Sequence, residues 1–235
     1  MGTMICAFEI TPRSPEQPGA EPDPVRGREP MFNAPWPALV LAVTIACAYA
    51  VQSRFSLDYV AQAYGFSAVA LEQGRWPTLL YALFLHGSWP HALMNAAFAL
   101  AFGTPLARWL GVRPMGALLF YAFYLACGVL ASLGFAALHL GSPEPLIGAS
   151  GAVSGLMGVA ARLIGGQGRM GPVFSRTVIA LGGALVVINV LVGVIGSALV
   201  PGAGGAPIAW EAHLFGFAAG VLLGGPLAWL AKRAV

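Results

Sequence analysis

Charged side chains are scarce in this sequence. Of 235 residues only 21 are charged, 12 Lys or Arg and 9 Asp or Glu, whereas about a quarter of an ordinary soluble domain is charged. So few charged side chains could not cover the surface of a soluble globular protein. They also exclude a chain whose main function is to bind nucleic acid through a charged surface. Three cysteines cannot form a disulfide framework. Because 58% of the residues are hydrophobic, the class that remains is a polytopic membrane protein.

Six apolar runs take up most of the chain after residue 33. They span residues 34–52, 90–108, 115–139, 148–162, 177–199 and 210–230. All but the short fourth run approach the roughly 20 residues that a helix needs to cross a bilayer. The runs lack the alternation of a closed barrel, so the backbone must satisfy its hydrogen bonds within helices. The sequence therefore predicts an all-α protein with six transmembrane helices and a long first external loop, 53–89. Within this loop, the apolar segment 76–85 predicts a helix at the membrane interface.

The first 30 residues have a different composition. Six of them are proline and five are acidic, a mixture that cannot bury a core. We expect a disordered cytoplasmic tail over residues 1–30 and a membrane domain over residues 31–235. Met31 directly precedes the first apolar run and could be the translation start.

Basic residues predict the orientation. With a cytoplasmic N-terminus, ten of the twelve Lys and Arg residues fall on the cytoplasmic side, and only Arg54 and Arg75 fall outside. This positive-inside bias predicts that both termini are cytoplasmic.

Polar groups within the apolar runs are costly in a bilayer and mark candidate functional positions. His86 and His91 lie at the entry to the second run, and Asn95 follows one turn after His91. Ser150 lies at the entry to the fourth run and His213 at the entry to the sixth. These three runs cross in the same direction in the predicted topology, so all five groups lie toward the external side.

Small residues would let Ser150 and His213 meet. Gly216 and Gly220 share a helix face with His213, and such stripes allow two backbones to approach closely. An imidazole beside a serine hydroxyl can take its proton and return it to a leaving amine. Because Glu211 lies on a different face and the three runs hold no other carboxylate, the sequence predicts a Ser–His dyad, not a triad.

His91 and Asn95 are candidates for a second role. They are four residues apart on one helix face, so both side chains could point toward the same oxygen. With the backbone N–H of Ser150 they could stabilise a developing oxyanion. The sequence holds no motif for a metal, a nucleotide or a redox group, so we expect no cofactor and no metal site.

Three motifs together resemble the signatures of rhomboid intramembrane serine proteases. They are Gly148-Ala149-Ser150-Gly151 opening a helix, His86 and His91 with Asn95, and Ala212-His213 with Gly216 and Gly220. The resemblance covers roughly residues 34–231 and is to the basic six-helix bacterial form. It implies that Ser150 is the nucleophile, His213 the general base, His91 and Asn95 the oxyanion donors and His86 a supporting residue.

The resemblance carries further expectations. It implies that the Arg75-Trp76 pair of the first external loop packs against the protein and stabilises the fold. It also implies that the fifth helix is a lateral gate and that 201–205 caps the site. Ser154 replaces an aromatic residue that often stacks on the catalytic histidine, so another contact, such as a hydrogen bond, must orient His213. Ala107 replaces a Glu that is frequent in the family, and a stabilising contact is expected to be lost there.

The function that follows is cleavage of single-span or other membrane proteins in or near their spanning segment. The resemblance also implies an integral protein of the bacterial inner membrane, with a site that opens to the periplasmic side. The partners are then the substrate and the lipid bilayer, with no nucleic acid; the oligomeric state stays open. Alternatives are a non-catalytic rhomboid-like protein that binds membrane clients, a small transporter, and a protease specialised for C-terminal sorting signals.

Overall fold

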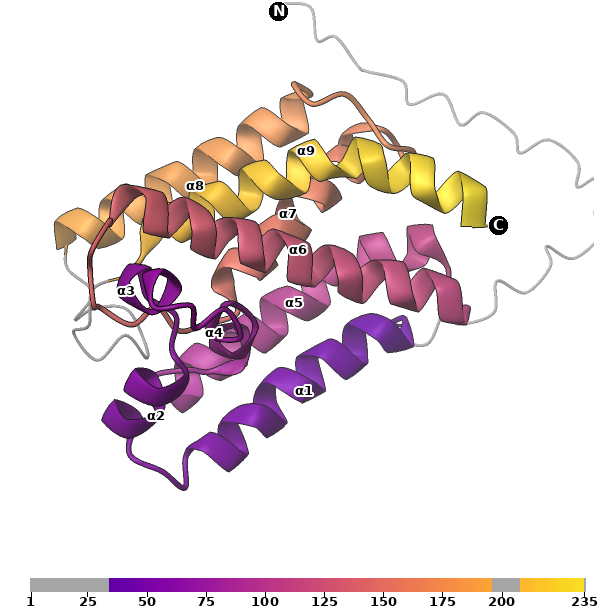
Figure 1. The fold of residues 1–235 in the computed structure, drawn as a ribbon. Helices are drawn as coiled ribbons and strands as arrows, with labels where there is room; N and C mark the ends of the chain where they lie inside the picture. Colours follow the sequence, from indigo (N-terminus) through magenta and orange to yellow (C-terminus); the bar gives the residue numbers. More distant parts are fainter. Residues whose placement is uncertain (1–33, 196–207, 235) are drawn as a thin grey trace, which may run out of the picture. The chain divides into compact units, whose positions relative to one another are not determined.

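Helices occupy all six apolar runs in the computed structural model, which describes residues 34–195 and 208–234 (Figure 1). Within these residues the only β-type pairing is a single bridge between Phe66 and Leu146, so the all-α prediction is confirmed. The elements are α1 (Trp36–Gln52), α2 (Leu57–Tyr64), α3 (Ala68–Glu72), α4 (Thr78–Tyr81), the 3-10 helix η1 (Ala82–Phe84), α5 (Trp89–Leu110), α6 (Pro114–Leu138), α7 (Ser150–Gly165), α8 (Arg176–Ile195) and α9 (Trp210–Ala234).

Length and composition identify fewer membrane spans than the six predicted. Of the described helices, α6 and α9 are long and apolar enough to cross a bilayer, and α1 with α2 could make one further span bent by 118°. The apolar helices α7 and α8 are shorter. Six spans therefore stay a prediction. The predicted tail 1–30, Met31 and the predicted cap 201–205 lie outside the described residues.

The short helix α7 is the centre of the fold. It packs against α5, α6, α8 and α9, and most of its residues are buried. Glycine makes this possible, because a side chain on Gly155 would collide with Cys127 of α6, and one on Gly220 of α9 would collide with the Gly155 carbonyl. The predicted stripes of small residues thus lie where α7 meets its neighbours.

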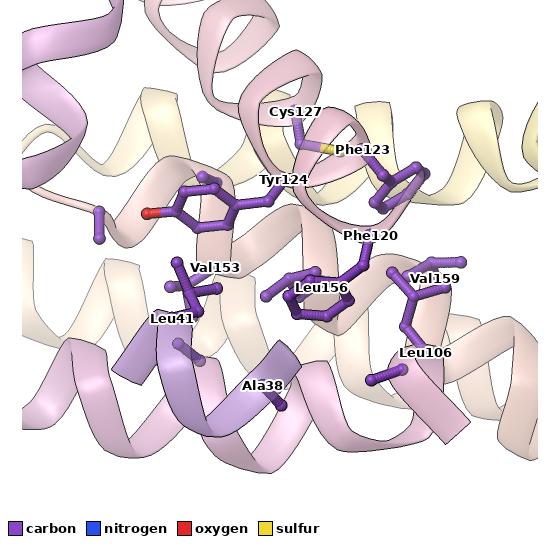
Figure 2. Close-up of a cluster of buried hydrophobic side chains, with 14 of the residues drawn as sticks. Ala38, Leu41, Leu106, Phe120, Phe123, Tyr124, Cys127, Val153, Leu156 and Val159 are labelled. Carbon is purple, nitrogen blue, oxygen red and sulfur yellow. The ribbon is translucent and has the colours of Figure 1, made fainter. Parts of the chain in front are cut away.

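Large apolar side chains fill the space between α7 and the helices α1, α5 and α6. Phe120 and Tyr124 of α6 lie among Leu156 of α7, Leu106 of α5 and Leu41 of α1, all at most 2% exposed (Figure 2). This cluster joins the four helices α1, α5, α6 and α7. It fixes the position of α7 within the described part of the chain.

The first loop is helical and is tied to the segment that precedes α7. The bridge joins Phe66 to Leu146 through two backbone hydrogen bonds, and the N–H of Gly148 donates to the carbonyl of Ala82 over 2.9 Å. The apolar segment predicted as one interfacial helix forms α4 and η1. Arg75 donates to the carbonyls of Gln62 and Ala63 at the end of α2.

The two members of the predicted Arg75-Trp76 pair differ in their surroundings. The Arg75 guanidinium makes hydrogen bonds within the first loop, whereas the Trp76 side chain is 61% exposed. The arginine of the pair is therefore fixed by hydrogen bonds to the end of α2.

Candidate active site

Ser150 begins α7 directly after a turn that only glycine adopts easily. Gly148 has φ +131°, a conformation strained for residues with a Cβ, and the helix starts two residues later. At the first turn of a helix the backbone N–H groups have no intrahelical acceptor, and the helix dipole is positive. The Ser150 hydroxyl therefore lies beside a natural site for negative charge.

His213 lies in the first turn of α9 and faces this hydroxyl. Its Nε2 is 2.8 Å from Ser150 Oγ. Gly216, one turn further along, lies so close to the carbonyl of Gly151 that a side chain would overlap it. The structure thus brings together the two groups of the predicted dyad, through the helix contact for which the glycines leave room.

The other ring nitrogen of His213 contacts a residue that the sequence interpretation overlooked. Nδ1 lies 3.0 Å from Oδ1 of Asn189, which is on α8 and is 7% exposed. Asn189 is the only amide in the apolar run 177–199. Because polar groups in such runs are functional candidates, the sequence alone indicates Asn189 as a candidate site residue. Because Ser154 stands where an aromatic residue often stacks on the histidine, the sequence predicts another contact, such as a hydrogen bond, for His213. The contact with Asn189 is of this kind.

His91 faces the turn that precedes Ser150. Its Nδ1 is oriented to accept the N–H of Gly87 at 3.4 Å, which leaves the proton of a neutral ring on Nε2. A side-chain carbon on Gly148 would lie 3.1 Å from this Nε2 and 3.7 Å from Ser150 Oγ. An oxygen atom in that position would be within reach of a donor and next to the nucleophile.

Asn95 is buried one turn below His91. Its amide donates one hydrogen to the carbonyl of His91 over 3.1 Å, within its own helix. This bond occupies one of two amide hydrogens and leaves the other for a further acceptor. The second motif thus contributes two polar side chains on one face of α5, as predicted from their spacing.

His86 is fully buried beneath the site. Its Nε2 accepts the N–H of Ala149 over 3.4 Å, so it contacts the residue before Ser150. Burial and, less strongly, the neighbouring His91 together lower the pKa of His86 to about 3, against a backbone hydrogen bond that raises it. The ring is therefore neutral at physiological pH and can accept this hydrogen bond.

Gln52 holds the backbone around His86 in place. The side-chain amide of Gln52 donates to the His86 carbonyl at 2.6 Å and accepts the His86 N–H at 2.9 Å. Gln52 is 7% exposed at the end of α1. Its position at the edge of an apolar run is typical of an interfacial residue, so the sequence carried no signal for this role.

The remaining histidine and the nearby carboxylate pair with each other. His139 Nε2 lies 3.2 Å from Glu211 Oε1, and the His139 ring stacks on Phe135. The hydrogen-bond partner of Glu211 is thus His139, while those of His213 are Asn189 and Ser150. Among residues 34–195 and 208–234, no group of three or more His, Cys, Asp or Glu side chains has a geometry that could hold a metal ion.

Comparison with known protein families gives one match. The model of the Rhomboid domain matches residues 73–230, which is more than half of the chain. The chain belongs to the rhomboid family. No curated protein matches this rhomboid closely enough to count as a relative. The matched residues contain Ser150 and His213 as well as His86 and His91. They do not include α1 with Gln52. The family match and the apolar helices support an integral membrane protein of a protease family.

Proposed function

We propose that this rhomboid is an intramembrane serine endopeptidase that cleaves membrane-anchored proteins in or next to their spanning helix. The observation that carries the proposal is the 2.8 Å contact between Ser150 Oγ and His213 Nε2. A hydroxyl and an imidazole at this distance can exchange a proton, which an alcohol needs in order to act as a nucleophile.

The reaction would proceed in two halves. Ser150 Oγ attacks the carbonyl carbon of the scissile bond while its proton moves to His213 Nε2, and the C–N bond then breaks as that proton passes to the leaving amine. A water molecule next attacks the acyl-enzyme and gives a proton to Nε2. When the ester bond breaks, this proton returns to Oγ, and the dyad is restored.

The oxyanion of each tetrahedral intermediate needs donors that are already in place. His91 Nε2 borders the position next to Gly148, together with Ser150 Oγ. The N–H groups of the first turn of α7 begin two residues after Gly148, and Asn95 lies on the same face of α5 as His91. Removing one such donor in a serine protease typically lowers kcat by about 10²–10³-fold. We assign this role to His91 and Asn95, and a supporting role beneath the loop to His86.

The substrate class follows from the chemistry of a bilayer. A peptide bond within a helix is protected by its own hydrogen bonds, so cleavage is favoured where proline or glycine unwinds the substrate. The distribution of basic residues supports six spans with both termini in the cytoplasm. In a bacterial inner membrane the site would then open toward the periplasm.

A reconstituted system tests the proposal. Proteoliposomes containing a single-span substrate should show cleavage by the wild type and a loss of at least about 10³-fold in Ser150→Ala and His213→Ala. Ser132→Ala is a matched control for the serine variant, because Ser132 is a buried helical serine outside the site. This control should retain cleavage.

A fluorophosphonate probe tests the nucleophile separately. It should label the wild type and Ser132→Ala but not Ser150→Ala. Equal cleavage by the wild type and Ser150→Ala would contradict the proposal. A wild type that neither cleaves nor takes up the label would favour the client-binding alternative.

A further inference from the structure

One face of α8 is packed, and Asn189 lies on it. Gly182, Leu185 and Asn189 follow one another at spacings of three and four residues, which places them on one side of the helix. Asn189 is 7% exposed, whereas its neighbours Ile188 and Val190 are 58% and 56% exposed. A polar side chain that is buried in an apolar helix needs partners.

Both ends of the Asn189 amide have a partner, and together they fix its orientation. Nδ2 donates to the carbonyl of Leu185 over 2.8 Å. Because a carbonyl can only accept, the nitrogen must point toward Leu185, and Oδ1 must therefore face His213 Nδ1 at 3.0 Å. The amide is oriented by its own helix.

This orientation determines which nitrogen of His213 carries the proton. Oδ1 accepts only, so a neutral imidazole must carry its hydrogen on Nδ1, and Nε2 is left with a lone pair toward Ser150 Oγ. The opposite tautomer would place an N–H against the hydroxyl and could not accept its proton. The hydrogen bond that Glu211 makes through Oε1 is to His139 Nε2 at 3.2 Å, whereas the partner of His213 Nδ1 is Asn189.

We propose that Asn189 is the positioning residue of the active site, and that the site is competent only while α8 packs against α9. This proposal rests on the proposed protease function and deepens it, from a dyad to a Ser150–His213–Asn189 array whose third member comes from a separate helix. The main neighbours of α8 in the described structure are α7 and α9. Displacement of α8 would remove the acceptor from Nδ1 without touching Ser150 or His213.

The α8–α9 contact is tightly packed at Gly182, seven residues before Asn189. A Cβ on Gly182 would lie 3.0 Å from Cε1 of the Phe217 ring on α9, so the larger side chain of valine would crowd this ring and disturb the contact between the two helices. The adjacent Gly183 has nothing within 4 Å of such a Cβ. These two glycines make a matched pair, since valine at either one has the same effect on helix propensity.

Variants of Asn189 test the hydrogen bond itself. Asn189→Leu keeps the branched shape of the side chain and removes the acceptor, and it should lower kcat about 10- to 100-fold with little change in KM. Asn189→Asp keeps an acceptor oxygen toward Nδ1 and should retain more activity than Asn189→Leu. Ile188→Ala, on the exposed side of the same turn, should match the wild type. Thermal unfolding of each variant separates loss of fold from loss of rate.

The histidine tautomer gives a readout that does not depend on activity. In protein labelled with ¹⁵N-histidine, the signals of His213 are assigned as those lost in His213→Ala among the four histidines. The wild type should carry its proton on Nδ1, and Asn189→Leu should show a mixture of tautomers. A proton on Nε2 in the wild type, or an unchanged spectrum in Asn189→Leu, would overturn the proposal even if the protein cleaves substrate.

The helix contact is tested with the glycine pair. Gly182→Val should lower kcat and mix the His213 tautomers as Asn189→Leu does, while Gly183→Val should do neither. Equal activity of the two valine variants would overturn the dependence on α8. If the wild type proves inactive, the proposed function fails, but the tautomer measurement still decides whether Asn189 positions His213.

Discussion

The contact between α7 and α9 leaves no room for a side chain at Gly216. A Cβ there would overlap the carbonyl oxygen of Gly151, whereas a carbon and a carbonyl oxygen normally stay about 3.3 Å apart. Gly216→Ala must therefore move α9 away from α7 by about 1 Å. Since His213 lies one turn before Gly216, its distance to Ser150 Oγ would grow from 2.8 Å to about 3.8 Å, beyond the range of a hydrogen bond. A displacement of this size lowers kcat by about 100-fold.

The assay for this variant is cleavage of a single-span substrate in proteoliposomes, with Gly225→Ala as the control. Gly225 lies on the same helix, and a Cβ there would have nothing within 4 Å. Both substitutions favour the helix intrinsically by up to about 1 kcal/mol, so only the crowding differs. If Gly216→Ala cleaves as fast as Gly225→Ala, the close helix contact does not set the distance between serine and histidine.

Three further outcomes are expected. Gly148→Ala should abolish cleavage, because alanine is strained at φ +131° and its methyl would fill the position beside His91 Nε2. If cleavage is lost but the fluorophosphonate label is kept, the defect lies in the oxyanion position. Normal cleavage by this variant would refute the assignment. Gln52→Ala should lower the free energy of unfolding by about 1–3 kcal/mol, since it leaves the buried backbone of His86 unpaired, and denaturation in detergent should show no such loss for the exposed Gln73→Ala. Burial lowers the pKa of His86 from 6.5 to about 3, so the unfolded chain binds the proton first as the pH falls below 6.5. Stability on the order of 4 kcal/mol is then lost toward pH 3, and His86→Gln should flatten this part of the stability profile; an unchanged profile would contradict the buried neutral ring.

Much of the helical architecture could be predicted because the apolar runs are long and are separated by Pro, Gly and basic residues. The run at 148–162 became α7, which begins at Ser150, and the run at 210–230 became α9. The packing of these helices was harder to predict. Helices such as α6 and α8 are apolar on nearly all sides, so periodicity does not show which face meets a neighbour. The four short elements of the first loop depend on backbone bonds such as those between Phe66 and Leu146, which no local pattern indicates.

The candidate site, like the fold, could be predicted from the sequence only in part. The residues of the three motifs were found from their types and spacing, because polar groups are rare in apolar runs. Asn189 is likewise a polar group in an apolar run, but it lies outside the three motifs. Gln52 carried no signal, because its partners are backbone groups of His86, 34 residues away. Distances such as the one between Ser150 and His213 depend on helix rotation and on contacts between glycines, which emerge only in three dimensions.

The order of the site residues along the chain has a consequence for synthesis. Ser150 is followed by Asn189 and, 63 residues after the serine, by His213, so α9 leaves the ribosome after α7 and α8. A nascent chain that has inserted only α1 to α7 holds Ser150 but lacks His213. Under the proposed function, proteolytic capacity therefore arises only when α9 has emerged and packs against α7.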